Sequence, residues 1–144
     1  MMNLIYIKEP IDIECILKKF KDTLKSLKRG DNFIGAMAIK FADNADFIAM
    51  YDKTKCIGFV AFYKNDDVNF ISYISMIAVD KSYQGIGIGK KLINEAEEKA
   101  KCCGMKYVRL EVDSDNINAQ KFYNKCGYTI LLKKTNSMIM QKIL

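Results

Sequence analysis

Three glycines at alternate positions mark the part of the chain best suited to bind an anion. The stretch from Gln84 to Lys90 reads QGIGIGK, and it lies between the apolar run Ile77-Ala78-Val79 and a segment of helical periodicity. Backbone amides at the start of a helix have no partner inside the helix, and the helix dipole adds positive potential there. Glycines leave those amides uncovered. The segment therefore predicts a cradle for a phosphate group.

The spacing of these residues disfavours two common phosphate sites. A P-loop has GxxxxGK followed by Ser or Thr, whereas this chain has Gln84 five residues before Gly89 and Lys91 at the Ser/Thr position. A dinucleotide fingerprint has GxGxxG in the first strand-to-helix turn, whereas Lys90 occupies the third glycine position counted from Gly85, in mid-chain. Nucleotide hydrolysis and dinucleotide binding are therefore not expected.

Two segments together resemble the GNAT superfamily of N-acetyltransferases. Gln84, Gly87 and Gly89 match the family's acyl-CoA signature of Gln or Arg, two residues, Gly, one residue, then Gly or Ala. Downstream, residues 116–128 read NINAQKFYNKCGY and resemble the family's SNxxAxxLYxKxGF segment, with these departures: Asp115 for Ser, Phe122 for Leu and Tyr128 for Phe. The resemblance is clear over residues 56–132 and extends to the flanks only by the order of the elements.

The resemblance implies acetyl-CoA as the acyl donor, with no metal. Its pyrophosphate would bind the amides of the glycine loop, namely those of Gln84, Gly85, Ile86, Gly87, Ile88, Gly89 and Lys90. Either Lys90 or Lys91 would screen the negative charge.

The resemblance also implies that the strand before the loop carries a bulge and splays away from the strand at residues 107–112. Splayed strands leave amides free to bond the pantetheine arm and to polarise a thioester carbonyl, and the candidates are those of Ile77, Ala78 and Val79. Asn116 either bonds the CoA arm or caps the following helix.

Acetyl transfer to an amine needs a base, a polarised carbonyl and an acid. Tyr123 matches the position at which family members often carry a Tyr that protonates the thiolate, although a Tyr beside Phe122 can also be a core residue. No carboxylate lies in residues 70–79, where many members have a Glu. Ser75 can hold a water that carries the proton away, and Glu111 and Asp113 are weaker alternatives.

By resemblance, residues 24–41 and 133–137 line the acceptor side. The expected acceptor is a primary amine on a small molecule or peptide, acetylated by direct transfer. The alternative is an acyl-CoA-binding sensor or interaction module without turnover. The last strands, with Met138 to Met140, can form a homodimer edge or part of the core, so both a monomer and a homodimer are expected states.

Composition excludes several kinds of catalytic site, metal site and binding partner. The chain has 144 residues and a mass of 16.5 kDa, which fits one domain over residues 1–144. It contains no His, which excludes Ser-His and Cys-His pairs and His-ligated metals, and its five Cys form no CxxC spacing. The net charge of +6 is dispersed without a block of like charges, so nucleic acid is not an expected partner. With no signal peptide and no run of about 18 apolar residues, a cytoplasmic protein without membrane contact is expected.

The elements that position these residues follow from periodicity. A helix is expected to begin at Ile11 and stop near Arg29, with apolar residues at helical spacing from Ile13 to Leu27, and a second is expected from Ile88 to Cys103. We expect Glu95 with Lys99, and Glu97 with Lys101, to pair on the exposed side of the second of these helices. A third helix follows Asn116, and residues 33–41 form a short helix or a strand. Strands are expected over residues 2–8, 46–51, 56–63, 69–79, 107–112, 128–132 and 138–143. The predicted fold is α/β, a mixed central sheet of six or seven strands flanked by about four helices, with splayed strands at the acyl-CoA slot.

Overall fold

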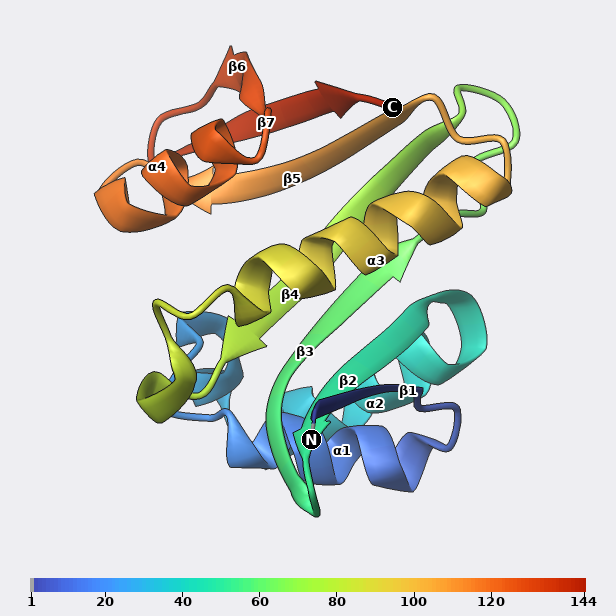
Figure 1. Ribbon diagram of the computed structural model, residues 1–144, viewed down its shortest axis with the longest axis vertical. Coiled ribbons are helices and arrows are strands. Elements are labelled where there is room, and N and C mark those ends of the chain that lie inside the picture. Colours follow the sequence, from blue (N-terminus) through green and yellow to red (C-terminus); the bar gives the residue numbers. More distant parts are fainter. Residues whose placement is uncertain (1) are drawn as a thin grey trace.

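The computed structural model describes residues 2–144 as one seven-stranded sheet with helices on both faces (Figure 1). The strand order is β1-β2-β3-β4-β5-β7-β6. The strands are β1 (Met2–Tyr6), β2 (Asp46–Asp52), β3 (Lys55–Tyr63), β4 (Ile71–Val79), β5 (Tyr107–Asp113), β6 (Thr129–Lys133) and β7 (Ser137–Ile143). The α-helices are α1 (Pro10–Lys19), α2 (Asp31–Asn44), α3 (Ile88–Cys102) and α4 (Ile117–Lys125), and short 3-10 helices occur at η1 (Lys25–Arg29) and η2 (Lys81–Tyr83). The predicted mixed sheet is confirmed.

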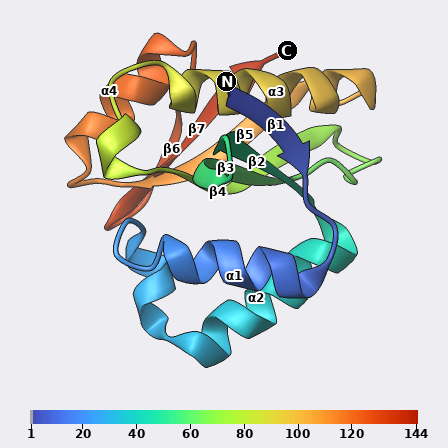
Figure 2. The ribbon, with the colours of Figure 1, turned by 60° about the horizontal axis from the view of Figure 1, so that its bottom comes forward.

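The sheet is antiparallel except where β4 pairs with β5. These two strands run parallel because α3 carries the chain back across the sheet between them. Figure 2 shows α1 and α2 on one face and α3 and α4 on the other. One apolar core lies under each pair of helices, and β3 between them is buried on both faces from Cys56 to Phe62.

Helix α3 follows the sequence prediction in its apolar stripe but not in its charged residues. Glu95 pairs with Lys99 at 3.7 Å, as predicted. Glu97 was expected on the exposed side with Lys101, and this is wrong: only 8 % of Glu97 is exposed. Its carboxylate accepts a hydrogen bond from the Tyr128 hydroxyl at 2.8 Å and pairs with Lys142 at 2.9 Å. Position 97 lies on the buried face between Ile93 and Ala100, and its partners come from distant parts of the chain.

The first predicted helix is broken in the structure. The apolar spacing predicts one helix from residue 11 to residue 29, but α1 ends at Lys19 and a 3-10 turn begins at Lys25. The spacing misleads because Phe20 and Leu27 pack into the same core as α1 although the backbone between them has left the helix. Residues 33–41, which fit either a helix or a strand, lie within α2.

None of the helices formed by residues 2–144 has the length and apolar character needed to cross a membrane. All five Cys are free thiols.

Candidate functional site

A β-bulge at Ser75 changes the direction of strand β4. Opposite β4, Ala61 pairs with Met76 and Phe62 pairs with Ile74, so Ser75 is an extra residue without a cross-strand partner in β3. As a result Ile74 and Ile77 both pack toward α3, whereas Met76 packs toward α1 and α2. The bulge bends β4 at the point where it separates from β5.

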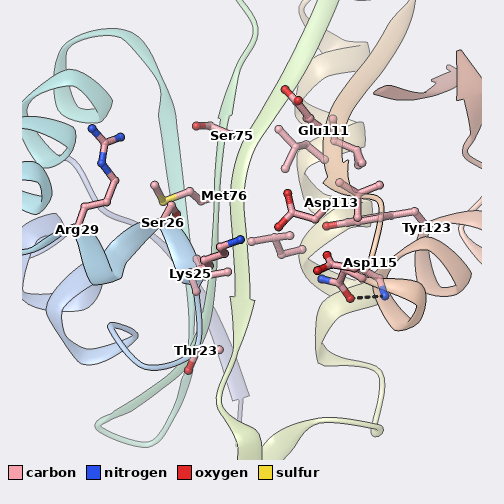
Figure 3. A pocket seen from close by; sticks show the side chains of 17 residues that line it. Thr23, Lys25, Ser26, Arg29, Ser75, Met76, Glu111, Asp113, Asp115 and Tyr123 are labelled. Atoms are coloured by element: carbon pink, nitrogen blue, oxygen red, sulfur yellow. Dashed lines mark hydrogen bonds between the residues drawn. The ribbon is translucent and has the colours of Figure 1, made fainter. Parts of the chain in front are cut away.

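Beyond the bulge, β4 and β5 separate and a cavity opens between them. Their pairing extends only from Ile71 with Tyr107 to Ile74 with Leu110, although both strands continue. The cavity has a volume of about 900 Å³ (Figure 3). It is lined by Thr23, Leu24, Lys25, Ser26, Arg29, Ile74, Ser75, Met76, Ile77, Leu110, Glu111, Val112, Asp113, Asp115, Asn116, Ala119 and Tyr123. Strand edges without a neighbouring strand present backbone groups that a ligand can bond.

The glycine loop follows β4 and leads into α3. Gly85 and Gly87 have φ angles of +82° and +92°, in the region that other residues adopt only with strain. Gly87 is the residue immediately before α3. Within residues 2–144, no group accepts a hydrogen bond from the amides of Gly85, Ile86, Gly87, Ile88, Gly89 and Lys90. Six unpaired amides therefore gather at the positive end of a 15-residue helix.

Three hydrogen bonds that involve side chains hold the glycine loop and the turn before it in place. The Gln84 side-chain amide donates to the Val79 carbonyl at 3.0 Å, and the Asp80 carboxylate accepts from the Ser82 amide at 2.9 Å. The hydrogen bond from Ser82 holds the pKa of Asp80 below its usual value. The Tyr83 hydroxyl donates to Asp52 at 2.8 Å. The side chain of Gln84 thus anchors the loop, and its own amide lies 3.5 Å from the Lys81 carbonyl.

Tyr123 lies in the wall of the cavity on the α4 side. Only 9 % of its surface is exposed, and its hydroxyl points into the cavity (Figure 3). In the described part of the chain this hydroxyl forms no hydrogen bond. Burial, and next the nearby Cys126, raise the pKa of Tyr123 to about 12. The phenol is therefore protonated at neutral pH and has a hydrogen to donate to a ligand.

Asn116 performs the capping role that its position predicts. Its Oδ1 accepts a hydrogen bond from the Ala119 amide at 3.1 Å, which begins α4. The residue also lines the cavity. Its side-chain NH₂ donates no hydrogen bond elsewhere in residues 2–144, so the same side chain has donors left for a ligand.

The residues considered as bases differ in their surroundings. Ser75 lines the cavity at the bulge. Glu111 accepts hydrogen bonds from the Ser137 hydroxyl and from Lys134 at 3.4 Å, which lower its pKa from the usual value. A carboxylate with a lowered pKa is a weak base. Asp113 also lines the cavity and makes no side-chain hydrogen bond within the described residues.

The predicted site residues fall into two neighbouring groups. Ser75, Ile77, Asn116 and Tyr123 surround the cavity. Ala78 and Val79 continue β4 past the cavity toward the glycine loop. In the part of the chain that the structure describes, no group of three or more His, Cys, Asp and Glu residues could hold a metal ion.

The sequence analysis did not single out two cationic residues that line the cavity. Lys25 and Arg29 belong to η1 and fall within the range 24–41 that the resemblance assigned to the acceptor side. The apolar spacing predicts one long helix that includes both residues. No local signal marks the break after Lys19, because Phe20, Leu24 and Leu27 keep the apolar spacing.

Parts of the chain are similar in sequence to curated proteins. One is an uncharacterised N-acetyltransferase, MJ1207, of Methanocaldococcus jannaschii, 36 % identical over 90 residues that make up 60 % of this chain and 40 % of the relative. Another is a probable spermine N(1)-acetyltransferase of Bacillus subtilis subsp. natto, 30 % identical over 90 residues, which are 56 % of this chain and 57 % of the relative. The chain therefore spans about half the length of these relatives.

Solved structures share the fold. A putative acetyltransferase of the GNAT family from Desulfovibrio desulfuricans superposes with a TM-score of 0.86 at 14 % identity, over 99 % of both chains. PaiA N-acetyltransferase from Thermoplasma acidophilum, solved in complex with coenzyme A, gives a TM-score of 0.80 at 18 % identity, over 100 % of this chain and 99 % of that one. The family model described as Acetyltransferase (GNAT) family matches residues 14–128. Since this match covers most of the 144 residues, the chain belongs to the GNAT acetyltransferase family.

Proposed function

We propose that this protein transfers an acetyl group from acetyl-CoA to a primary amine by direct transfer. The observation that carries the proposal is the placement of six unpaired amides, from Gly85 to Lys90, in the loop that follows β4, the strand that forms one wall of the cavity. Family membership supports acetyl transfer in general. PaiA N-acetyltransferase, which shares this fold, has been solved with coenzyme A.

The residues present fit acetyl-CoA. The amides of Gly85 to Lys90, with that of Gln84, bind the pyrophosphate, and the dipole of α3 stabilises its charge. A β-carbon added at Gly85 or Gly87 would meet no protein atom within 4 Å, so the space above the loop is open to a ligand. Lys90 and Lys91, in the first turn of α3, screen the remaining charge.

The cavity then holds the thioester end. When bound, acetyl-CoA supplies an acetyl thioester, whose carbon accepts the amine nitrogen while the carbon–sulfur bond breaks. The amides of Ile77 and Val79, on the edge of β4 that faces away from β3, bond the pantetheine arm and the carbonyl oxygen. The predicted role of the Ala78 amide is not retained, because alternation along the strand places it on the β3 edge together with the Asp80 amide, which donates to the Ile57 carbonyl. Asn116 bonds the arm through its free NH₂ donors.

Two hydroxyl groups take part in the two proton transfers of the reaction. Tyr123 donates its phenolic proton to the leaving sulfur, since its hydroxyl faces the cavity and stays protonated at neutral pH. Ser75 holds a water that takes the proton from the attacking amine and passes it to solvent.

The test is a melting experiment with acetyl-CoA followed by an assay for CoA release with a panel of amines. A ligand that binds the native state at 100 times its Kd adds about 2.7 kcal/mol of stability, so the melting temperature should rise by several degrees. We expect both this rise and release of CoA with at least one amine. No rise at millimolar acetyl-CoA would contradict the proposal.

One observation favours the alternative, an acyl-CoA-binding sensor without turnover. The cavity-lining part of β4, Ile74 to Ile77, contains no carboxylate, and the pKa of Glu111 is lowered. Tight binding of acetyl-CoA without CoA release for any amine would support the sensor.

A further inference from the structure

Charged side chains of both signs line the cavity. In β5, Leu110 and Val112 pack into the core under α3, so the alternating residues Glu111 and Asp113 face the side of α1 and α2. From that side Lys25 and Arg29 of η1 also line the cavity (Figure 3). The cavity therefore has a cationic wall formed by η1 and an anionic wall formed by β5 (Figure 3).

Three of these charged side chains have no ionic partner within the described residues. Within residues 2–144, Lys25, Arg29 and Asp113 form no ion pair within 4 Å and no side-chain hydrogen bond. The Arg29 guanidinium stacks on the ring of Phe33 at 4.1 Å from the ring centre. Stacking orients the guanidinium and leaves its edge, which carries the N–H donors, open.

The two walls continue into an adjoining space. A second cavity of about 280 Å³ is lined by Lys25, Asp113, Ser114, Asp115, Thr135 and Asn136. Lys25 and Asp113 line both cavities. Glu111 differs from Asp113, because Lys134 and Ser137 already bond its carboxylate. Asp113 and Asp115 are thus the anions, and Lys25 and Arg29 the cations, whose side chains keep their full hydrogen-bonding capacity for a ligand.

Tyr123 independently indicates that a ligand occupies this space. It is nine-tenths buried, and its hydroxyl points into the cavity without a partner in the described chain. The ring is held in place by burial while the hydroxyl itself is accessible from the cavity, so a ligand there can accept its hydrogen.

We propose that the acyl acceptor is a free α-amino acid, so that one small molecule carries both the amine and a carboxylate. This deepens the proposed function and rests on it. Arg29, with Lys25, binds the carboxylate through paired N–H donors, and Asp113 holds the ammonium group near β4 before it loses its proton. The amine nitrogen forms the amide bond, and CoA leaves as the thiol.

Other amines fit these charges less well. A polyamine would bring its second ammonium group toward Lys25 and Arg29, where like charges repel. A peptide N-terminus has no carboxylate next to its amine and would leave both cations unmatched. Leu24, Ile74, Met76 and Leu110 also line the cavity, so an apolar amino-acid side chain is favoured.

The experiment compares L-leucine and L-methionine with their carboxamides and with spermidine. Each carboxamide keeps the amine and the side chain but lacks the carboxylate, and it mimics a peptide N-terminus. The kcat/KM of each is measured by CoA release. The Kd of each is measured by calorimetry with the protein saturated by CoA. We expect both amino acids to bind and react at least about tenfold better than their carboxamides and than spermidine, which is the effect of losing one charged hydrogen-bonded pair.

Variants then locate the carboxylate. Arg29→Gln should raise the KM and Kd of L-leucine about tenfold while leaving kcat and the values for leucinamide within about twofold. Lys28→Gln is the matched control, because Lys28 is an exposed cation of the same η1 segment that does not line the cavity. Lys28→Gln should leave the KM, Kd and kcat of both L-leucine and leucinamide unchanged.

The outcomes separate the two proposals. If acetyl-CoA fails to raise the melting temperature, the proposed function fails and this inference with it. If acetyl-CoA binds but the carboxamides or spermidine equal or exceed the amino acids, the inference alone is overturned. An equal effect of Arg29→Gln on leucine and leucinamide would also overturn it.

Discussion

The ring of Phe122 lies against the backbone of Gly89. A β-carbon at position 89 would come within 3.1 Å of the Phe122 Cζ atom, closer than such atoms normally approach. Gly89 belongs to the first turn of α3 and Phe122 to α4. This contact joins the two segments that resemble the family's motifs, because it packs the start of α3 against α4, the helix that carries Tyr123.

We predict that substitutions at these two positions are coupled. Gly89→Val should destabilise the protein by about 1–3 kcal/mol through overpacking against the aromatic ring. The same substitution should be about 1 kcal/mol milder in a Phe122→Leu background, where the ring is gone. Urea denaturation of the four proteins measures this difference. Additive effects would show that the contact does not constrain the two helices.

Gly87→Val should abolish acetyl-CoA binding while the fold survives. The substitution forces a branched side chain into a φ of +92° directly before α3, which displaces the unpaired amides. Gly104→Val is the matched control, since Gly104 has a φ of +84°, has open space around its α-carbon and follows the other end of α3.

Both of these glycine variants should lose a similar amount of stability, about 1–3 kcal/mol. Calorimetric titration should show binding only in Gly104→Val. Equal affinity of the two variants for acetyl-CoA would argue that the loop amides do not bind the ligand.

Tyr123→Phe should lower kcat by about 10²- to 10⁴-fold if the phenol protonates the leaving sulfur. Burial raises the pKa of Tyr123 to about 12, so the acid form persists well above neutral pH. The wild-type kcat should therefore show no loss from Tyr123 ionisation between pH 7 and about pH 10. A kcat of Tyr123→Phe close to that of the wild type would remove the acid role.

The same pKa has a consequence for stability. Because the folded-state pKa of Tyr123 is raised, the neutral phenol favours folding fully below the unfolded value of about 10. That contribution is lost as the pH rises from about 10 toward 12. The Tyr123→Phe variant should lose less stability than the wild type over this interval, as measured by urea denaturation at each pH.

Glu97 should be the most sensitive charged residue of α3. It is buried beside the Tyr128 hydroxyl and pairs with the partly exposed Lys142, so Glu97→Ala leaves the buried Tyr128 hydroxyl without a partner and should cost about 1–3 kcal/mol. Glu95→Ala is the control. Its pair with Lys99 is exposed to solvent and should contribute less than about 0.5 kcal/mol. Similar losses in both variants would contradict this assignment.

The parts of the fold that local patterns determine could be predicted from the sequence. The apolar stripe of α3, the Asn116 cap and the left-handed Gly127 each depend on residues within a few positions of one another. The break after Lys19 could not be predicted, because Phe20 and Leu27 keep the apolar spacing while the backbone turns.

The candidate site was predictable to the same limited extent. The glycine loop and Tyr123 were found through short motifs that act locally. That Arg29 and Asp113 line the same cavity depends on the long-range packing of η1 and β5, and the partners of Glu97 lie 31 and 45 residues away. No local pattern encodes such contacts.

The central claim is that the amides of Gly85 to Lys90 bind the pyrophosphate of acetyl-CoA. Titration of ¹⁵N-labelled protein with CoA, followed by NMR of the backbone amides, tests it residue by residue. The account predicts the largest shifts at Gly85 to Lys90, with smaller ones at Ser75 to Val79 and at Asn116. Saturable binding that leaves the amides of residues 85–90 unshifted would contradict it.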